Sequence, residues 1–292
     1  MYKIASLGEV LWDMLPTGKK VGGAPGNFAY HCRKFGADAV MISRVGDDLS
    51  GHELLAFYRS CGLPTGLISI DPYHQTGAVD VTFSQNGCME YCFREDVAWD
   101  HFTADEKSLA LIRESDVICF GTLAGRTRKS ARELQKLILA ASPKTVRLFD
   151  VNLRAPHYEK ATILELLGLT GILKLNDEEL PVLCRMPGCT ETDGEIQAAW
   201  LREKYQLPLL ILTCGKKGSL LVTKHEASRY QSVPVTVADT VGAGDAFTAA
   251  ALTGFLRGEP LDRIHRSASK LAAFVCTQQG AMPDYDEKWN TI

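Results

Sequence analysis

Short apolar runs alternate with longer amphipathic segments along most of the chain. A short apolar run between polar or glycine positions predicts a buried β-strand, and apolar residues that recur every three or four positions predict a helix that covers it. The predicted strands span residues 4–7, 39–43, 117–120, 146–149, 172–175, 209–213 and 220–223. The predicted helices span residues 27–35, 51–60, 129–141, 162–167, 195–205, 245–257 and 261–277. This alternation predicts an α/β fold, in which a doubly wound, mainly parallel sheet carries helices on both faces.

One segment departs from this alternation. Residues 77–93 hold two stretches of alternating apolar and polar positions, joined by Asn86-Gly87. Asn-Gly between two such stretches is a strong signal for a β-hairpin. Because an antiparallel hairpin fits poorly into a parallel sheet, we expect it to project as a lid or an interaction surface. A surface decoration without function is the alternative.

The stretch VADTVGAGDAF, residues 237–247, places small residues directly before Asp245, where a helix is predicted to begin. We expect a strand over residues 233–237 to lead into this turn. The N–H groups of a glycine turn at a helix N-terminus carry partial positive charge and favour an anion. A carboxylate beside such a site suits phosphoryl transfer to an alcohol, where it accepts the hydroxyl proton. A capped helix after a tight turn is the simpler alternative.

Composition and missing motifs narrow the class of protein. The 292 residues are 46% hydrophobic, and a net charge of −3 gives no reason to expect nucleic acid or an anionic membrane as partner. No apolar run approaches the roughly 20 residues of a membrane helix, and the first residues do not resemble a signal peptide. The nine cysteines are scattered without a CxxC pair, so we expect free thiols and a cytoplasmic protein. The chain lacks GxxxxGK[ST] and GxGxxG, which disfavours P-loop ATPases and NAD-dependent enzymes.

Several segments, in order, resemble the PfkB (ribokinase-like) family of carbohydrate kinases. DTVGAGD at 239–245 resembles the family's C-terminal signature, and GGAPGN at 22–27 resembles its N-terminal sugar site. The further matches are GEVLWD at 8–13, aligned with the first strand, SRVGDDLSG at 43–51, DVNLR at 150–154, NDEE at 176–179, TCGKKG at 213–218 and CTQQGA at 276–281. The resemblance implies one kinase domain over residues 1–292, with a discontinuous β lid from about 9–22 and 73–100. Its reaction would be transfer of the ATP γ-phosphoryl group to a sugar hydroxyl.

The resemblance also implies a role for each matching position. Asp245 would be the catalytic base, beside an anion hole formed by Gly242, Ala243 and Gly244. The positions that would bind the sugar are Asp13, Gly22, Gly23, Asn27 and Asp245. The positions that would bind ATP are Asn176, Thr213, Gly215, Lys216, Gly218, Gly242 and Gly244. Without the resemblance, Asn27 would be interpreted as a helix cap, residues 213–218 as a turn between strands and Lys216 as a solvated charge.

Two cation sites follow from the same resemblance. Mg²⁺ and its waters would be ordered by Asn152, Asn176 and Glu179. A monovalent cation, K⁺, would be bound by Asp239, the carbonyl of Val241, Gly280 and Asp284. Gln278 stands where several relatives carry an arginine, a departure from the family pattern that bears on cation activation.

The closest resemblance is to bacterial fructokinases, which share the GExLxD opening and a site similar to GGAPxNxAYH. We therefore expect D-fructose as the acceptor, ahead of 2-keto-3-deoxygluconate and ribose. Arg94 and Arg154 could supply the cations that a keto acid's carboxylate needs. Because fructokinases also carry an arginine after DxN, Arg154 does not discriminate, and a solvated strand-end charge is the alternative for Arg94. A catalytically silent sugar or nucleotide sensor is the alternative of a different class, and the intact Asp245 argues against it. We also expect a homodimer formed through the lid.

Overall fold

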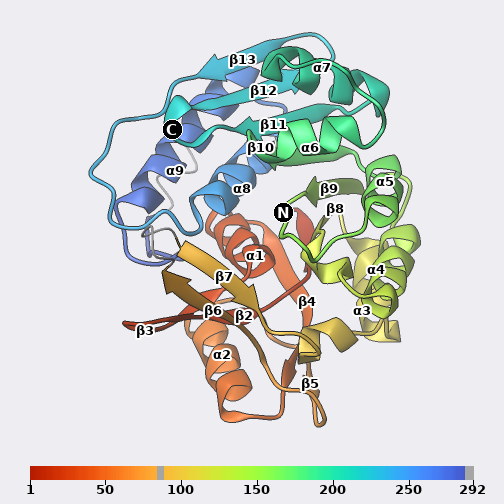
Figure 1. Cartoon of the computed structure of the whole chain (residues 1–292), viewed down its shortest axis with the longest axis vertical. Helices are drawn as coiled ribbons and strands as arrows, with labels where there is room; N and C mark the ends of the chain where they lie inside the picture. The colour runs from red at the N-terminus through yellow and green to blue at the C-terminus, as the bar shows by residue number, and fades with distance from the viewer. Residues whose placement is uncertain (84–88, 287–292) are drawn as a thin grey trace.

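Two β-sheets organise the chain, which the computed structural model describes over residues 1–83 and 89–286 (Figure 1). The larger sheet has the strand order β13-β12-β11-β10-β9-β8-β1-β4-β5. Neighbouring strands are parallel from β5 to β11, whereas β12 and β13 add to one edge in antiparallel pairs. The strands of this sheet are β1 (Lys3–Leu7), β4 (Asp38–Gly46), β5 (Ile68–Asp71), β8 (Val117–Gly121), β9 (Val146–Asp150), β10 (Ile172–Asn176), β11 (Leu209–Thr213), β12 (Ser219–Thr223) and β13 (Ala227–Tyr230).

Helices cover both faces of the larger sheet. One face carries α1 (Ala24–Lys34), α2 (Leu49–Ser60), α8 (Ala243–Leu256) and α9 (Leu261–Cys276). The other carries α3 (Glu106–Glu114), α4 (Arg128–Ala140), α5 (Lys160–Gly168), α6 (Glu179–Arg185) and α7 (Gly194–Lys204). In β11, Leu209 and Ile211 join the first core, and Leu210 and Leu212 join the second. Because both faces are buried, such strands appear in the sequence as continuous apolar runs.

The smaller sheet is a lid built from two separate stretches of chain. Its strand order is β3-β2-β6-β7, with β2 (Leu11–Leu15) and β3 (Gly18–Gly22) following β1, and β6 (Gly77–Phe83) and β7 (Met89–Phe93) following β5. The two stretches meet through a parallel pair between β2 and β6. The lid rests on α2, where the indole Nε1 of Trp12 donates to the carbonyl of Ser50 at 2.9 Å. Since β1 and β5 are parallel members of one sheet, both stretches leave from its carboxyl edge.

The predicted fold class is confirmed, and every predicted strand and helix of the larger sheet and its covering layers is present, with ends shifted by up to three residues. The β6–β7 hairpin also forms, although Asn86-Gly87 lies outside the described residues. Two predictions are wrong. Residues 231–242 contain no strand, because Pro234 has no N–H to donate and β13 already pairs with β12. Asp13 does not end the first strand, which stops at Leu7; it lies within β2 of the lid.

The sequence pattern missed β5, β13, α3 and α6, which are short or weakly apolar. The cysteines in the described part of the chain carry free thiols, as expected. Among the helices of residues 1–83 and 89–286, none combines the length and the apolar character needed to cross a membrane.

Candidate active site

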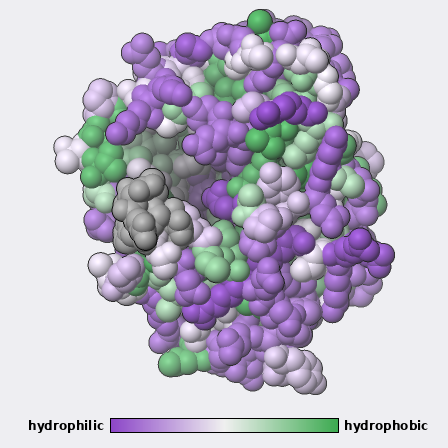
Figure 2. Space-filling model, in the orientation of Figure 1, coloured by the Kyte–Doolittle hydropathy of each residue, from purple (hydrophilic) through white to green (hydrophobic). Residues whose placement is uncertain are grey.

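Polar side chains gather where the parallel strands of the larger sheet end. Asp150 is the last residue of β9, Asn176 the last of β10 and Thr213 the last of β11, while Glu9 follows β1. Parallel strands end at a common edge, and open α/β sheets bind their ligands there. The register places Asn176 directly beside Thr213. Figure 2 shows that the face displayed in Figure 1 is hollowed near its middle, with hydrophilic residues around the hollow.

The two glycine motifs meet at Asp245. This residue lies in the first turn of α8 and is 9% exposed. The side-chain amide of Asn27, in α1, donates from Nδ2 to Oδ2 of Asp245 at 2.8 Å. The other amide atom of Asn27, Oδ1, is buried without a hydrogen-bond partner among the described residues. The contact therefore joins the predicted base to the predicted sugar site and leaves one acceptor available to a ligand.

The pKa of the Asp245 carboxyl is raised to about 6, mainly by burial and in addition by the charge of Asp150. The positive charges of Lys174 and Arg154 and the hydrogen bond from Asn27 oppose this rise. A carboxylate with a pKa near 6 is ionised at neutral pH and still basic enough to accept a proton. Asp245 thus has the protonation behaviour that a general base needs.

The turn before α8 is fixed by close packing. Gly242 has a φ of 79°, and a Cβ there would lie 2.5 Å from the Cβ of Ala281 in the segment after α9. A side chain at this position is therefore excluded both by backbone conformation and by space. Ala243 and Gly244 begin the helix, whose first N–H groups have no acceptor within it. The turn holds a set of N–H donors at the N-terminus of α8, directly beside Asp245.

The lid contributes Asp13 through a second close approach. A Cβ on Gly22 would lie 2.5 Å from Oδ2 of Asp13, so this glycine leaves room for the carboxylate. Gly23 follows it as the residue before α1. Burial raises the pKa of Asp13 to about 6, and the guanidinium of Arg154 opposes the rise. Since Arg154 also acts on Asp245, its positive charge lies near the carboxyls of both the lid and α8.

Arg94, the other predicted cation, is engaged within the lid. Its Nε donates to Oδ2 of Asp80 at 3.0 Å and its Nη2 to Oδ1 at 2.9 Å, a bidentate pair between β6 and the end of β7. The pair is about half exposed. The guanidinium of Arg94 is thus bound to the carboxylate of Asp80 on the neighbouring strand.

Residues 176–179 tie the end of β10 to the loop after β9. Oε2 of Glu179 accepts the N–H of Asn176 at 2.8 Å, and Oε1 accepts the N–H of Leu153 at 2.8 Å. Oδ1 of Asn176 accepts the N–H groups of Glu178 and Glu179. The neighbouring Asn152 has a φ of 43°, an uncommon conformation for a residue with a side chain. The oxygens of this network retain lone pairs that suit metal-bound waters better than direct coordination.

The turn between β11 and β12 carries the other predicted ATP positions. Thr213 ends β11, and residues 214–218 reverse the chain into β12. Gly215 and Gly218 both have positive φ, and the carbonyl of Lys216 accepts a hydrogen bond from Ser232. Because Thr213 adjoins Asn176, this turn and the residue 176–179 network form one continuous stretch of the carboxyl edge.

Asp239 links three segments next to the glycine turn. Its carboxylate accepts the N–H of Val241 at 3.1 Å and the N–H of Gly280 at 3.2 Å. It also forms an ion pair of 3.0 Å with Lys20, on lid strand β3. The predicted partner Asp284 is exposed, and its carboxylate pairs with Lys34. An ammonium group thus already contacts the carboxylate that was predicted to hold K⁺.

Comparison with known proteins identifies the family. The family model described as "pfkB family carbohydrate kinase" matches residues 8–288. The chain belongs to this family. A probable fructokinase-3 from Arabidopsis thaliana is 28% identical to this PfkB kinase over an alignment of 306 positions. The alignment covers 96% of the chain and 87% of the relative.

Solved structures of PfkB-like kinases share the fold. A sugar kinase of uncharacterised function from Pyrococcus horikoshii is 26% identical, with a TM-score of 0.84 over 98% of this chain and 95% of that one. Fructokinase from Vibrio cholerae, in a form that binds fructose, ADP and calcium, is 22% identical, with a TM-score of 0.80 over 97% and 95% of the two chains. A double mutant of that fructokinase contains fructose, ADP and potassium. The PfkB chain therefore has the ribokinase-like fold and is a phosphotransferase with an alcohol acceptor.

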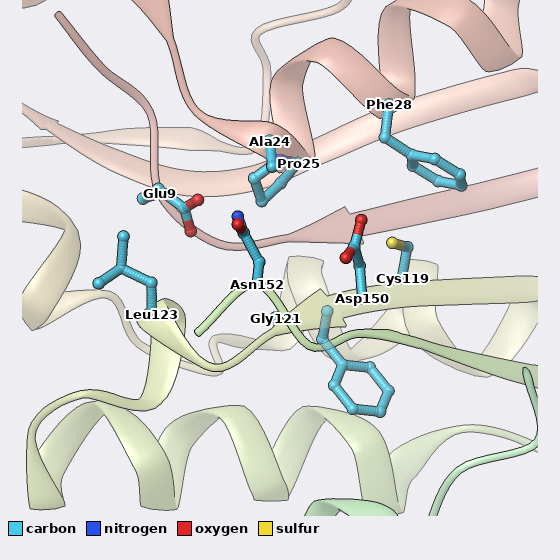
Figure 3. A pocket seen from close by; sticks show the side chains of 10 residues that line it. Glu9, Ala24, Pro25, Phe28, Cys119, Gly121, Leu123, Asp150 and Asn152 are labelled. Atoms are coloured by element: carbon cyan, nitrogen blue, oxygen red, sulfur yellow. The ribbon is translucent and has the colours of Figure 1, made fainter. Parts of the chain in front are cut away.

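Sequence reasoning assigned no role to several charged residues of this PfkB site, among them Glu9 and Lys174, which lie near Asp150. Glu9 is 3% exposed, its Oε2 has no hydrogen-bond partner in the described part of the chain, and burial raises its pKa to about 7. Figure 3 shows Glu9, Asp150 and Asn152 around one small pocket, with a free volume of about 10 Å³, enough for about one water molecule. Glu9 lies two residues after the buried strand β1, a position that could have marked it as a site residue.

Lys174 is the second of these residues. It is 8% exposed, and its Nζ donates to Oδ1 of Asp150 at 3.0 Å. Burial alone would lower the pKa of Lys174, but the carboxylates of Asp150, Glu179 and Asp245 raise it above its usual value. A Cβ on Gly244 would lie 3.6 Å from Nζ, so this cation lies against the start of α8. A lysine inside an apolar strand was the signal that could have found it.

Proposed function

We propose that this PfkB kinase transfers the γ-phosphoryl group of ATP to D-fructose. The observation that carries the proposal is the buried contact between Asp245 and Asn27, which joins a base of suitable pKa to the sugar-side helix. The curated relatives at 27–29% identity include several fructokinases of plants, which supports the acceptor.

Each residue at the start of α8 and beside it has a separate role in the proposed reaction. Asp245 accepts the proton of the acceptor hydroxyl as that oxygen bonds to the γ-phosphorus, while the bond from phosphorus to the β–γ bridging oxygen breaks and ADP leaves. The N–H groups of Gly242–Gly244 stabilise the charge on the transferred group. Lys174 adds a fixed positive charge behind this turn. The base and its stabilising donors thus come from one helix start.

The sugar would lie between the lid and α1. Asp13 and Oδ1 of Asn27 accept hydrogen bonds from sugar hydroxyls, and the bare backbone at Gly22 and Gly23 allows close approach. Glu9, partly protonated near neutral pH, can donate one hydrogen bond and accept others. Closure of the lid excludes water, which would otherwise compete as the phosphoryl acceptor.

ATP would bind along residues 213–218, with Asn176 beside the phosphates. Mg²⁺, which neutralises phosphate charge when it is bound, fits the network of Asn152, Asn176 and Glu179 through its waters.

We propose K⁺ at Asp239, in competition with the ammonium of Lys20. A kinase of this kind would work in the cytoplasm, where ATP is supplied.

The state of Arg94 supports fructose over 2-keto-3-deoxygluconate. A keto acid's carboxylate needs a cation, and the guanidinium of Arg94 is already paired with Asp80 through two hydrogen bonds. The acidic groups Glu9 and Asp13 would also repel an anionic acceptor when ionised. A neutral sugar meets neither obstacle.

The test is a comparison of kcat/KM for fructose, 2-keto-3-deoxygluconate and ribose at saturating MgATP. We expect fructose to have the highest value and Arg94→Ala to leave it nearly unchanged. A tenfold advantage for the keto acid, removed by Arg94→Ala, would overturn the acceptor but not the kinase. ADP release with none of several sugars would instead favour the sensor.

We also propose a homodimer formed through the lid. The lid sheet is small, with β3 and β7 at its edges, and Tyr91 on β7 is 53% exposed. Light scattering at micromolar concentration should give twice the chain mass of 32.0 kDa. A single species of the chain mass would contradict the dimer.

A further inference from the structure

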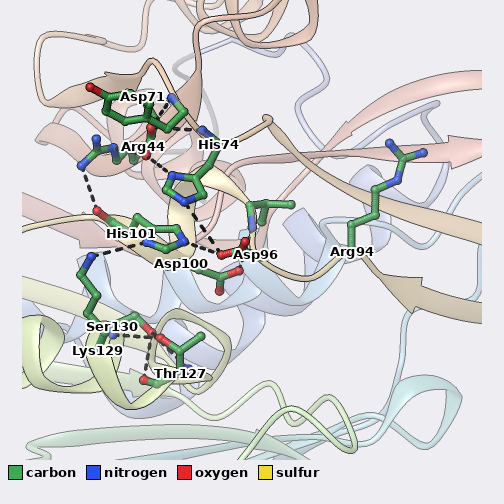
Figure 4. Close-up of polar contacts among 12 residues, drawn as sticks. Arg44, Asp71, His74, Arg94, Asp96, Asp100, His101, Thr127, Lys129 and Ser130 are labelled. Atoms are coloured by element: carbon green, nitrogen blue, oxygen red, sulfur yellow. Dashed lines mark hydrogen bonds and ion pairs between the residues drawn. The ribbon is translucent and has the colours of Figure 1, made fainter.

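Three side chains at the base of the lid converge on one point, away from the proposed kinase residues. His74 precedes β6, whereas Asp96 and His101 lie on the return from β7 to the larger sheet. Nε2 of His101 is 2.7 Å from Oδ1 of Asp96, and Nε2 of His74 is 3.9 Å from the same oxygen. One potential ligand atom from each residue lies within 4.8 Å of the other two. Figure 4 shows both rings beside Asp96.

His74 directs its ring nitrogen Nε2 toward Asp96 and its Nδ1 toward Asp71. Its Nδ1 is 2.9 Å from Oδ2 of Asp71, which is 1% exposed. Despite burial, hydrogen bonds from the backbone of Tyr73 and from His74 keep the pKa of Asp71 below its usual value. In the neutral tautomer that donates from Nδ1 to Asp71, the lone pair of Nε2 points toward the carboxylate oxygen of Asp96. Two acceptors in this arrangement are stabilised by a cation between them.

The distances suit a transition metal. Ligand atoms of a tetrahedral Zn²⁺, each about 2.1 Å from the metal, lie about 3.4 Å apart. The observed 2.7 Å and 3.9 Å lie on either side of this value. Asp96 has a side chain that is 79% exposed, so it can adjust without disturbing packed neighbours. The two imidazole rings stack with centroids 3.6 Å apart and planes 15° apart, which brings both Nε2 atoms to the same side.

The surroundings hold one ligand in place. Asp71 anchors Nδ1 of His74 and forms an ion pair of 2.9 Å with Arg44. Arg44 also donates to the carbonyl of His101 at 2.9 Å, so a single guanidinium connects both histidine segments. A carboxylate that orients an imidazole from its far nitrogen is the usual second layer of a zinc site.

We propose that His74, Asp96 and His101 bind a divalent transition metal, best matched by Zn²⁺, with the remaining coordination position taken by water. Imidazole nitrogens favour zinc over Mg²⁺ and Ca²⁺, which take oxygen ligands. This site is separate from the cations of phosphoryl transfer. His74 lies where the chain enters the lid, and Asp96 and His101 lie where it leaves. A bound metal would therefore link the two segments that connect the lid to the larger sheet.

The test is calorimetric titration of the chelator-treated full chain with ZnCl₂. We expect saturable binding of one Zn²⁺ per chain, weakened at least about tenfold in each of His74→Gln, Asp96→Asn and His101→Gln. His52→Gln is the matched control, since His52 is an exposed histidine that pairs with Asp47, and it should bind zinc as the parent does. Thermal melting of Asp96→Asn, a change at an exposed side chain, should match that of the metal-free parent.

Two results would overturn the proposal: no saturable binding by the parent chain, or equal binding by the parent and all three ligand variants, which would place zinc elsewhere, such as on thiols. Lys129 gives an independent check. Its Nζ is 3.5 Å from Nδ1 of His101, the atom that must take the proton when Nε2 binds metal. Lys129→Gln should therefore tighten zinc binding, and weaker binding would contradict the assignment of Nε2 as a ligand.

Discussion

At Asp245, burial and neighbouring charges act in opposite directions on one carboxyl group. Burial and Asp150 raise its pKa, whereas Lys174, Asn27 and Arg154 lower it, and the balance lies at about 6. The role of a base therefore depends on residues from α1, β9 and β10 as well as on the helix that carries it.

The first prediction removes the proposed base. Asp245→Asn should lower kcat by about 10²–10⁴, the usual contribution of a general base, with KM values for sugar and ATP changed far less. Steady-state ADP release measures both. Asp13→Asn is the matched control, because loss of a sugar-binding carboxylate should act mainly on KM for the sugar. A fall in kcat of less than tenfold for Asp245→Asn would rule out its role as the base.

The second prediction concerns pH. Because Asp245 must be ionised to accept a proton and its pKa is about 6, kcat/KM should fall tenfold per pH unit below about pH 6. Lys174 lowers this pKa, so Lys174→Met should move the acidic limb to higher pH. Profiles of kcat/KM from about pH 5 to about pH 8 measure the shift. A limb that moves to lower pH, or stays in place, would show that Lys174 does not act on the base.

At this scale, the sequence could identify residues whose neighbours along the chain form a motif. Asp245 and Asn27 lie in glycine-rich segments, and the structure brings them together. Glu9 and Lys174 could not be assigned, because their role depends on charges from other strands. Whether Arg94 binds a substrate stays a prediction. Its ion pair with Asp80 could not be foreseen, because it depends on the register between β6 and β7, which residue types alone do not define.

Among the elements, β3 makes an unusual connection. It carries Lys20 from the lid to Asp239, beside the glycine turn, and Nζ also approaches Oε1 of Gln279 at 3.3 Å. The position of the lid is thereby coupled by charge to the segment next to the proposed anion site.

The third prediction follows from this contact. If Lys20 and K⁺ compete for Asp239, Lys20→Met should make activity more dependent on K⁺, because the internal ammonium is gone. Rates in K⁺, Na⁺ and Tris buffers of equal ionic strength, compared between Lys20→Met and the parent, measure the effect. Lys19→Met on the same strand is the control, since Lys19 pairs with Glu53 of α2. Identical K⁺ dependence in all three proteins would argue against a cation site at Asp239.

Elements that are buried on both faces were predictable, because their apolar runs admit few other interpretations. The strand expected over residues 233–237 failed partly because of its own Pro234 and partly for a reason that lies outside its sequence: the edge of β12 is taken by β13, a strand of only four residues. The lid strand β2 was assigned to the first strand for a similar reason, since the break after Leu7 depends on where the chain leaves the sheet.

For the whole molecule, the site has a cost in stability, which gives the fourth prediction. The pKa of Glu9 rises from 4.5 to about 7 on folding, so the folded protein binds its proton more tightly than the unfolded chain. This contribution is fully present below about pH 4.5 and is lost as pH rises through 7; the difference is about 3 kcal/mol. Glu9→Gln should therefore raise the free energy of unfolding at pH 8 by up to about 3 kcal/mol.

Urea denaturation at about pH 4.5 and at pH 8 checks this, with exposed Glu226→Gln as the control. The gain in Glu9→Gln should appear at pH 8 and nearly vanish at the lower pH. A gain of equal size at both pH values would mean that packing, and not ionisation, is responsible.

The parallel pair between β2 and β6 joins segments that are far apart in the chain, with Leu11 opposite Gly77. Between them lie α1, β4, α2 and β5, so their pairing closes a long loop of chain. Contacts of such separation form late in folding, because the loop-closure entropy has to be overcome first. We expect this pairing to form after the local contacts within each segment, and the lid, whose own core is only Leu11, Val79 and Val81, to be among the first parts whose amides exchange with solvent. The proposed opening of the lid for substrates would then draw on the part of the molecule with the least buried core of its own.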